Sequence, residues 1–107
     1  MNDKLKNLEL KLKKVKQSFK FVSKSIELAL SMKEGLSNSA KHYLFQYQVL
    51  LESNWHLLEK YEYRINKLKE KEITTKEYEH ISRVLNNLIA DHQAKAISID
   101  NILEDYK

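Results

Sequence analysis

Apolar residues in the first third of the chain recur at alternating spacings of three and four positions. The series runs without a miss through Leu5, Leu8, Leu12, Val15, Phe19, Val22, Ile26 and Ala29. Such spacing places every member on one stripe of an α-helix, like the a and d positions of a coiled coil. The pattern predicts a long helix over about residues 2–34, which ends where Gly35 can adopt the left-handed conformation that terminates helices.

A second stretch, over about residues 38–72, has a wider apolar face with about three positions in each heptad. This width is typical of a helix that packs against two neighbours. Ser37, Asn38 or Ser39 is expected to cap its amino end. The members of the face are Tyr43, Leu44, Tyr47, Leu50, Leu51, Leu57, Leu58, Tyr61, Ile65 and Leu68.

A capping signal precedes the third apolar stretch. Thr74 and Glu77 have the T-x-x-E spacing of a capping box, and Ile73 and Tyr78 occupy the positions of a hydrophobic staple. We therefore predict a third helix over about residues 75–106. Its apolar face consists of Tyr78, Ile81, Leu85, Leu88, Ile89, His92, Ala96, Ile99, Ile102, Leu103 and Tyr106.

The three predicted helices together form one domain of residues 1–107. Short connections make sequential helices antiparallel, so we predict an all-α, antiparallel up-down-up three-helix bundle with coiled-coil-like heptad packing. The absence of proline and the presence of a single glycine favour such long helices. The heptad can also be continued through Gly35 into Leu36 and Ala40, which leaves a long two-helix antiparallel hairpin as the alternative.

Two polar residues, Asn54 and His92, interrupt the apolar faces. Antiparallel register places Asn54 opposite about residue 93 and near Gln17 and Ser18, so we predict a buried polar layer in the middle of the bundle. Such a layer fixes helix register at some cost in stability, and replacing both residues with leucine is expected to raise the melting temperature. A pH-sensitive histidine and a small-ligand pocket are the functional alternatives.

The residue types that carry catalysis are scarce or scattered. Cysteine is absent, which removes disulfides and thiolate chemistry, and one glycine cannot build a phosphate-binding loop. His42, His56 and His80 fall on outer helix positions, apart from one another. We therefore predict that the protein is not an enzyme, with no catalytic residue, no metal site and no cofactor.

The stretch from Tyr78 to Ala94 is superficially similar to the last helix of the helical chorismate mutases. Those enzymes hold a dicarboxylate with several arginines drawn from their first and middle helices. This chain has only Arg64 and Arg83, and its first predicted helix has none. The similarity is limited to helical patterning and implies no activity.

The first predicted helix is strongly basic, with nine lysines against three acidic residues over positions 1–33, in a chain of net charge +4. Such a surface can contact an acidic protein or nucleic acid. Lysine without arginine or interleaved exposed aromatics makes nucleic acid the less favoured partner. The predicted basic patch consists of Lys4, Lys6, Lys11, Lys13, Lys14, Lys16, Lys20 and Lys24.

Several large apolar residues remain after the core positions are assigned. Phe21, Leu28 and Met32 form a second stripe on the first helix, and antiparallel register places Phe45 and Val49 near the same end of the bundle. Monomeric proteins seldom expose so much apolar surface without a partner, although a wider core could absorb it. The predicted partner-binding residues are Phe21, Leu28, Met32, Phe45, Val49 and Trp55.

These features favour a non-enzymatic protein–protein interaction module, such as a small adaptor, chaperone or inhibitor. It would bind a larger protein or a second copy of itself through an exposed apolar helix face. An immunity or anti-toxin protein and a component or partner of a bacterial secretion system are alternatives. The Trp-x-Gly proteins of type VII secretion share the size and helical make-up, but here Trp55 is followed by His56 and Leu57, so their glycine turn is absent.

The sequence also carries an expectation about location. No stretch approaches the roughly 18 apolar residues of a membrane span. Lysines interleave with the first leucines, which disfavours a secretory signal. A cytoplasmic protein is expected, and secretion without a leader stays open.

Overall fold

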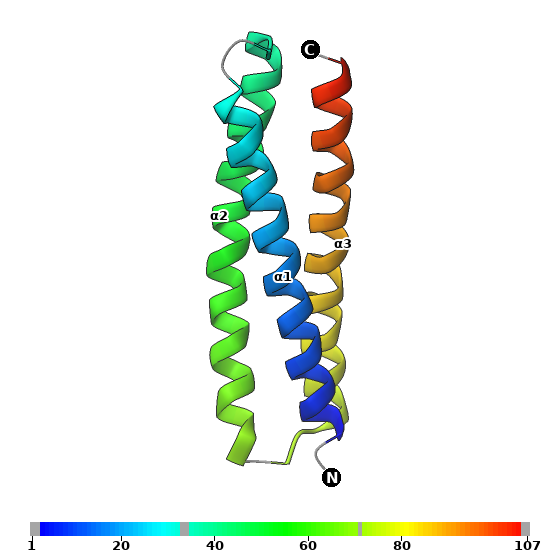
Figure 1. Ribbon diagram of the computed structural model, residues 1–107. Coiled ribbons are helices and arrows are strands. Elements are labelled where there is room, and N and C mark those ends of the chain that lie inside the picture. Colours follow the sequence, from blue (N-terminus) through cyan, green and yellow to red (C-terminus); the bar gives the residue numbers. More distant parts are fainter. Residues whose placement is uncertain (1–2, 33–34, 71, 106–107) are drawn as a thin grey trace.

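Three long helices account for most of the computed structural model, which describes residues 3–32, 35–70 and 72–105 (Figure 1). Helix α1 spans Asp3–Ser31, α2 spans Asn38–Lys67, a short 3₁₀ helix η1 spans Leu68–Glu70, and α3 spans Thr75–Asp105. The helices form a bundle 54 Å long and 18 by 16 Å across. They run up, down and up in Figure 1, so the predicted three-helix bundle is confirmed.

The two-helix alternative is wrong, because the helical conformation ends at Ser31 and resumes at Asn38. Ser37 caps α2, with its Oγ accepting a hydrogen bond of 3.1 Å from the backbone N–H of Ala40. No described residue has a positive φ, so the left-handed conformation expected at Gly35 is not observed. Buried Leu36 instead ties this connection to the core.

The second connection follows the predicted capping motif. Thr74 Oγ1 accepts a hydrogen bond of 3.1 Å from the backbone N–H of Glu77, and Ile73 and Tyr78 pack against the adjacent core. Helix α2 ends at Lys67, earlier than the expected residue 72, because the chain tightens into η1. The expected helix ends at residues 2, 34 and 106 lie outside the described residues.

Removing the cap of α3 is expected to weaken the fold. Thr74→Ala deletes the side-chain acceptor for the N–H of Glu77, and loss of such a cap costs about 1 kcal/mol. Urea unfolding followed by circular dichroism measures the change. Ser39→Ala is the matched control, because Ser39 is exposed in the first turn of α2 but is not its cap. Equal losses for the two variants would contradict the capping role of Thr74.

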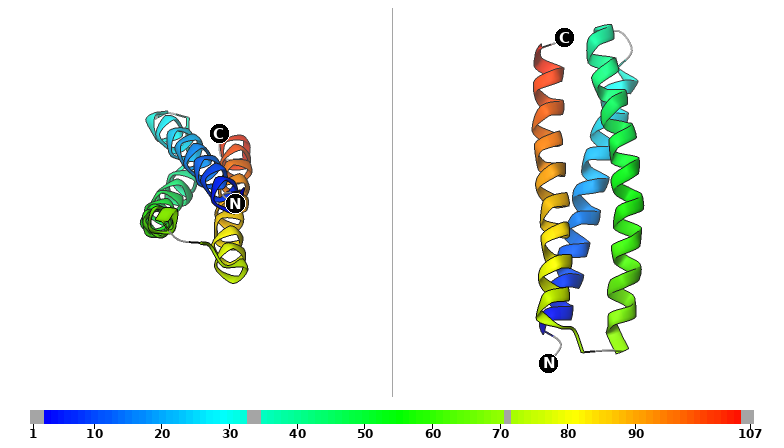
Figure 2. Two further views of the ribbon diagram at one scale, coloured as in Figure 1. Left: turned by 90° about the horizontal axis from the view of Figure 1, so that it is seen from below. Right: turned by 180° about the vertical axis from the view of Figure 1, so that it is seen from behind.

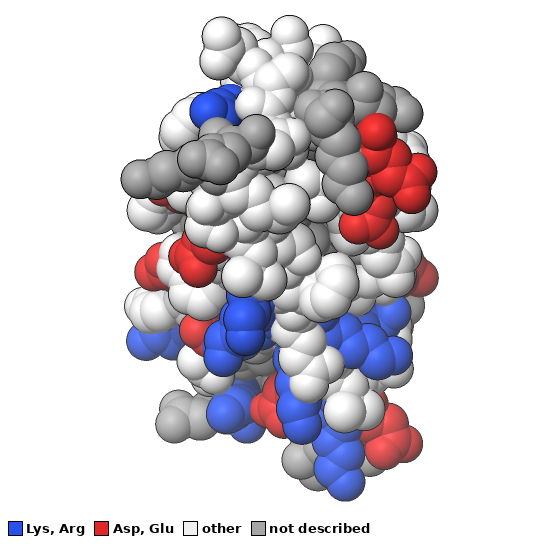
Figure 3. Space-filling view, turned by 45° about the horizontal axis from the view of Figure 1, so that its top comes forward, with Lys and Arg blue, Asp and Glu red and all other residues white. Residues whose placement is uncertain are grey.

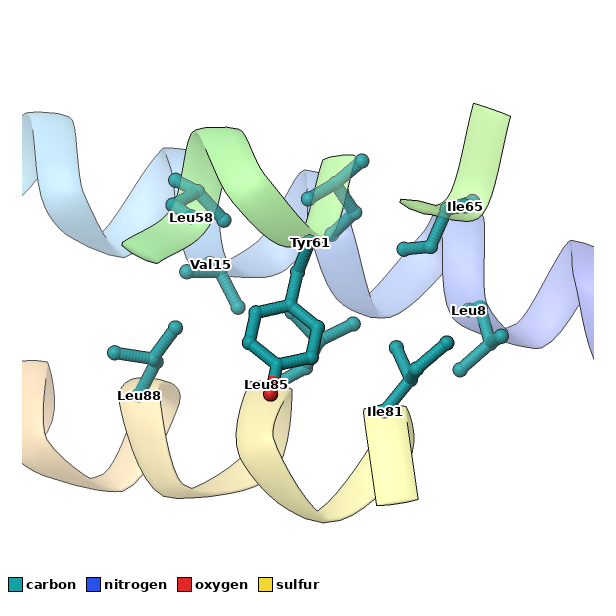
Figure 4. Close-up of a cluster of buried hydrophobic side chains, with 9 residues drawn as sticks. Leu8, Val15, Leu58, Tyr61, Ile65, Ile81, Leu85 and Leu88 are labelled. Carbon is teal, nitrogen blue, oxygen red and sulfur yellow. The ribbon is translucent and has the colours of Figure 1, made fainter. Parts of the chain in front are cut away.

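The core is divided into two clusters along the bundle. The lower cluster lies at the end of the bundle where the chain begins, and Figure 4 shows Tyr61 reaching from α2 toward α3 among its aliphatic neighbours. The upper cluster lies at the end that holds the first connection, where Ala29 and Ala40 let α1 and α2 approach closely. The lower cluster is Leu8, Leu12, Val15, Leu58, Tyr61, Ile65, Ile81, Leu85 and Leu88, and the upper cluster is Val22, Ile26, Ala29, Leu36, Ala40, Leu44, Leu51, Ile99 and Ile102.

The seam predicted for the first helix is confirmed, because each of its members is buried or half-buried. The broad face predicted for the second helix is only partly inward. Tyr43, Leu50 and Leu57 are exposed, since they lie on the side of α2 toward α3, where these two helices contact each other least. Most contacts in the bundle are made by α1.

Helix α1 crosses the bundle diagonally. It begins beside the amino end of α3 and leans toward α2 at the upper end, as the views of Figures 1 and 2 agree. Side-chain hydrogen bonds join α1 to α3 from Lys4, Asn7, Lys11 and Ser18. Among the described residues, no side-chain hydrogen bond joins the two helices above Ser18, and their buried residues there belong to the upper cluster.

Candidate functional site

A surface groove lies between α1 and α3 at the level of the hydrogen bond that joins Ser18 to His92, and both of these residues line it. Its volume is about 710 Å³. Phe21 of α1 and Ile97 of α3 form its two walls and are 65% and 63% exposed. Val22 and Ala96 line the space between them, so the groove is mainly apolar.

The groove is a consequence of helix placement. The side-chain positions that would close it are occupied on α3 by Gln93 and by the small residue Ala96. Leu28 follows Phe21 at i+7 on the same side of α1, Met32 directly follows the end of this helix, and both are exposed. An apolar stripe therefore continues from the groove toward the upper end of α1.

The structure does not bring all the predicted partner-binding residues together. Phe45 and Val49 are exposed, but they border a separate shallow depression formed by α2 alone. The expected single patch is therefore wrong, because antiparallel register gives two residues the same height without placing them on the same side of the bundle. The outer face of α1, which carries Lys20 and Glu27, separates the two surfaces.

Trp55 is not a surface residue of the kind predicted. It is half-buried and packs against the lower cluster, with its ring 4.7 Å from the ring of Phe19. The exposed position expected for Trp55 is therefore not observed, and its role in partner binding stays a prediction. The indole contacts α1 because α2 presents it beside its inner stripe, three residues before the buried heptad position of Leu58.

His92 lies at the level where both clusters end, and its side chain is 1% exposed. Ser18 Oγ donates to the backbone oxygen of Val15 at 2.9 Å and lies 2.8 Å from His92 Nδ1. A hydroxyl has one proton, so both contacts are satisfied when Nδ1–H of His92 donates to Ser18. Nε2 is then a buried acceptor, and it has no hydrogen-bond partner among the described residues.

The surroundings of His92 disfavour its charged form. Burial lowers the pKa of the imidazole below its ordinary 6.5, because the imidazolium would lose its hydration. The carboxylate of Asp91 acts in the opposite direction, and the ammonium of Lys95 adds to the lowering. His92 is therefore a neutral core residue near neutral pH.

Asn54 shares the level of His92 but not its hydrogen bonds. Its Nδ2 donates to Asp91 Oδ2 at 2.9 Å, and Lys95 donates to the same oxygen. Burial acts to raise the pKa of Asp91, but the two donors outweigh it and hold this pKa below its ordinary value. Asn54 and His92 do not bond to each other, because the amide donates to Asp91 of α3, whereas the imidazole bonds to Ser18 of α1.

Lys95 is the polar core residue that the sequence pattern did not reveal. It is only 8% exposed, because its position at i+3 from His92 and i+7 from Leu88 places it on the inner stripe of α3. The spacing could have identified Lys95 as a core position, but a charged residue is not counted in an apolar pattern. Lys95, Asp91 and Asn54 line a second shallow groove, between α2 and α3.

The predicted basic patch divides into two groups. Lys4, Lys11 and Lys16 bond to Thr75, Asn86 and Glu62, and thereby hold the helices together. The others extend into solvent without a polar partner among the described residues, and Figure 3 shows most Lys and Arg side chains gathered in the lower part of that view. These free lysines are Lys6, Lys13, Lys14, Lys20 and Lys24.

The described part of the chain contains no group of three or more residues arranged to hold a metal ion. His80 shares a hydrogen bond of 3.1 Å with the hydroxyl of Tyr61, so it serves the lower cluster although it is exposed. Within the same described residues, no helix has the length and apolar character needed to cross a membrane.

Comparisons with protein-family models, curated proteins and solved structures find no match to the chain. Function is therefore inferred from the geometry of the chain's own residues.

Proposed function

We propose that the protein is a non-enzymatic helical binding module, of the adaptor, chaperone or inhibitor kind, that docks a larger protein in the groove between α1 and α3. The observation that carries this proposal is the exposure of Phe21 and Ile97 on opposite walls of one groove. Large side chains that line a concave apolar surface are the usual anchors of protein recognition.

The apolar stripe above the groove supports the same proposal. Leu28 extends the surface along α1, Met32 directly follows this helix, and both lie outside the two core clusters. Their exposure does nothing for the stability of the isolated bundle, and contiguous exposed apolar surface commonly marks a site of association. Phe45 and Val49 on α2 form a smaller surface, which is the secondary candidate.

Phe21→Asp is expected to abolish partner binding without unfolding the protein. A carboxylate at the wall of the groove would be buried unpaired in the complex, which costs at least about 2 kcal/mol, or about 30-fold in Kd. The measurement is affinity purification from the native host, followed by titration of the purified partner. Circular dichroism checks that helicity is unchanged.

Tyr63→Asp is the matched control, because Tyr63 is 62% exposed on α2 and lies outside the groove. Partner binding that survives Phe21→Asp and Leu28→Asp would refute the proposed surface. Loss of binding with Val49→Asp alone would move the site to the surface on α2.

A further inference from the structure

We propose that the groove between α1 and α3 receives one amphipathic helix of the partner, which runs antiparallel to both helices and carries acidic residues toward its carboxyl end. This inference rests on the proposed function and specifies the partner segment. It follows from the length of the apolar stripe, the direction of the two helices and the charges at the two ends of the groove.

The stripe has the dimensions of a helix-binding surface. Phe21 and Leu28 are seven positions apart on α1, which corresponds to about 10 Å, or two helical turns, and Met32 follows directly after the last residue of α1. Two parallel helices with an apolar floor between them accept one further helix, whose anchors recur at i, i+4 and i+7. A partner segment of about three to four turns covers the exposed stripe.

The direction of the partner helix follows from the helix dipoles. Helices α1 and α3 are parallel, so their negative carboxyl ends both lie at the upper end of the bundle. Neither helix has a basic residue in its last turn, and Glu104 adds a negative charge near the end of α3. The amino end of an antiparallel helix brings a positive dipole to this place, whereas a parallel helix would bring a negative one.

The lysines at the other end of the groove select the charge of the partner. Lys14 lines the groove one heptad below Phe21, and Lys24 lies beside the stripe between Phe21 and Leu28. Neither lysine has a polar partner among the described residues. Acidic side chains in the carboxyl half of the bound helix would meet these two ammonium groups, while Asp100 and Glu104 at the upper end disfavour acidic residues in its amino half.

A second copy of this chain is a poorer occupant by the same criteria. The acidic end of its α3, with Asp100 and Glu104, carries one exposed large apolar residue among those that the structure describes, Ile97. The α1 helix of a second copy has the apolar stripe, but its lysines would lie close to Lys14 and Lys24 of the first copy and repel them. The charges therefore favour a foreign helix.

The test uses displayed peptides of about five helical turns, so that the probe exceeds the stripe at both ends. The library has a fixed apolar stripe and flanking positions randomised among glutamate, glutamine and lysine. Binders are selected on the intact protein, sequenced, and titrated as synthetic peptides at low and high ionic strength. Phe21→Asp, Lys14→Glu and the control Lys6→Glu are titrated in parallel, because Lys6 is exposed on α1 but distant from the groove.

We expect glutamate to be enriched in the carboxyl half of the binders, and Lys14→Glu to weaken them about tenfold at low salt while Lys6→Glu changes little. Phe21→Asp is expected to abolish their binding. Neutral or lysine-rich binders that still depend on Phe21 would overturn the acidic helix but leave the proposed function standing. Binders that ignore Phe21→Asp, or no binders at all, would overturn the helix-docking inference itself, while native partner capture separately decides the proposed function.

Two other occupants are distinguished with the protein alone. Sedimentation equilibrium that showed a dimer dissociated by Phe21→Asp would assign the groove to a second copy and overturn the inference. Flotation with vesicles of phosphatidylcholine and phosphatidylglycerol that is lost with Phe21→Asp would assign the groove to a lipid surface. This result would also overturn the inference. We expect a monomer that does not float.

Discussion

Leu85→Ala is expected to lower the free energy of unfolding by about 2–5 kcal/mol, which is the usual cost of truncating a fully buried leucine. Leu85 is completely buried in the lower cluster, where residues from all three helices surround it (Figure 4). The neighbouring side chains can fill only part of the cavity that the truncation leaves, because they are already close-packed. The loss is a large fraction of the total stability of about 5–15 kcal/mol that small domains have.

Chemical denaturation with urea, followed by circular dichroism, measures this loss. Val49→Ala is the matched control, because it removes apolar carbons from a residue of α2 that is mainly exposed. The control is expected to change stability by less than about 0.5 kcal/mol. A loss below about 1 kcal/mol for Leu85→Ala would mean that the lower cluster is not close-packed around this residue.

His92→Leu is expected to stabilise the protein by about 1 kcal/mol near neutral pH, since it removes a buried acceptor that has no partner. Ser18 keeps its hydrogen bond to the backbone oxygen of Val15, so the substitution orphans no hydroxyl. For a domain of this size the gain corresponds to a rise of about 4–8 °C in melting temperature. The single substitution is a cleaner test than one that also removes Asn54, which donates to Asp91.

The same substitution is expected to change the pH dependence of stability. Burial lowers the pKa of folded His92 below the unfolded value of 6.5, so below this pH the unfolded chain binds more protons than the folded one. Stability of the parent protein therefore falls as pH drops through 6.5, by at most about 1.4 kcal/mol per pH unit, and the fall ends below the folded pKa. His92→Leu removes this contribution, so its advantage grows as the solution is acidified.

Thermal unfolding from about pH 7 to about pH 5 measures both effects. His56→Leu is the control, because His56 is exposed on α2 and its replacement leaves the buried imidazole in place. A melting temperature of His92→Leu that lies below that of the parent protein at neutral pH would show that the imidazole stabilises the bundle. An unchanged pH dependence would show that His92 is not the group that titrates.

The sequence alone determined the three helices and the inner stripe of α1. An unbroken spacing of three and four fixes which side of α1 is buried, because the α-helix has a constant rotation per residue. Thr74 and Ser37 were identifiable as caps because the interactions that they make are local. The exposure of Phe21, Leu28 and Ile97 was also foreseeable, since each falls beside its stripe.

Only the tertiary structure decided where α1 diverges from α3. The diagonal course of α1 opens the groove at Phe21 and Ile97, separates it from Phe45, and lets Trp55 pack on Phe19. A heptad pattern carries no information about such a tilt, because it specifies the inner side of each helix but not the angle between two helix axes. The sequence therefore identified Phe21, Leu28, Met32, Phe45 and Val49 as lying outside the core, whereas the packing of the helices decided the burial of Trp55 and the exposure of Leu50 and Leu57.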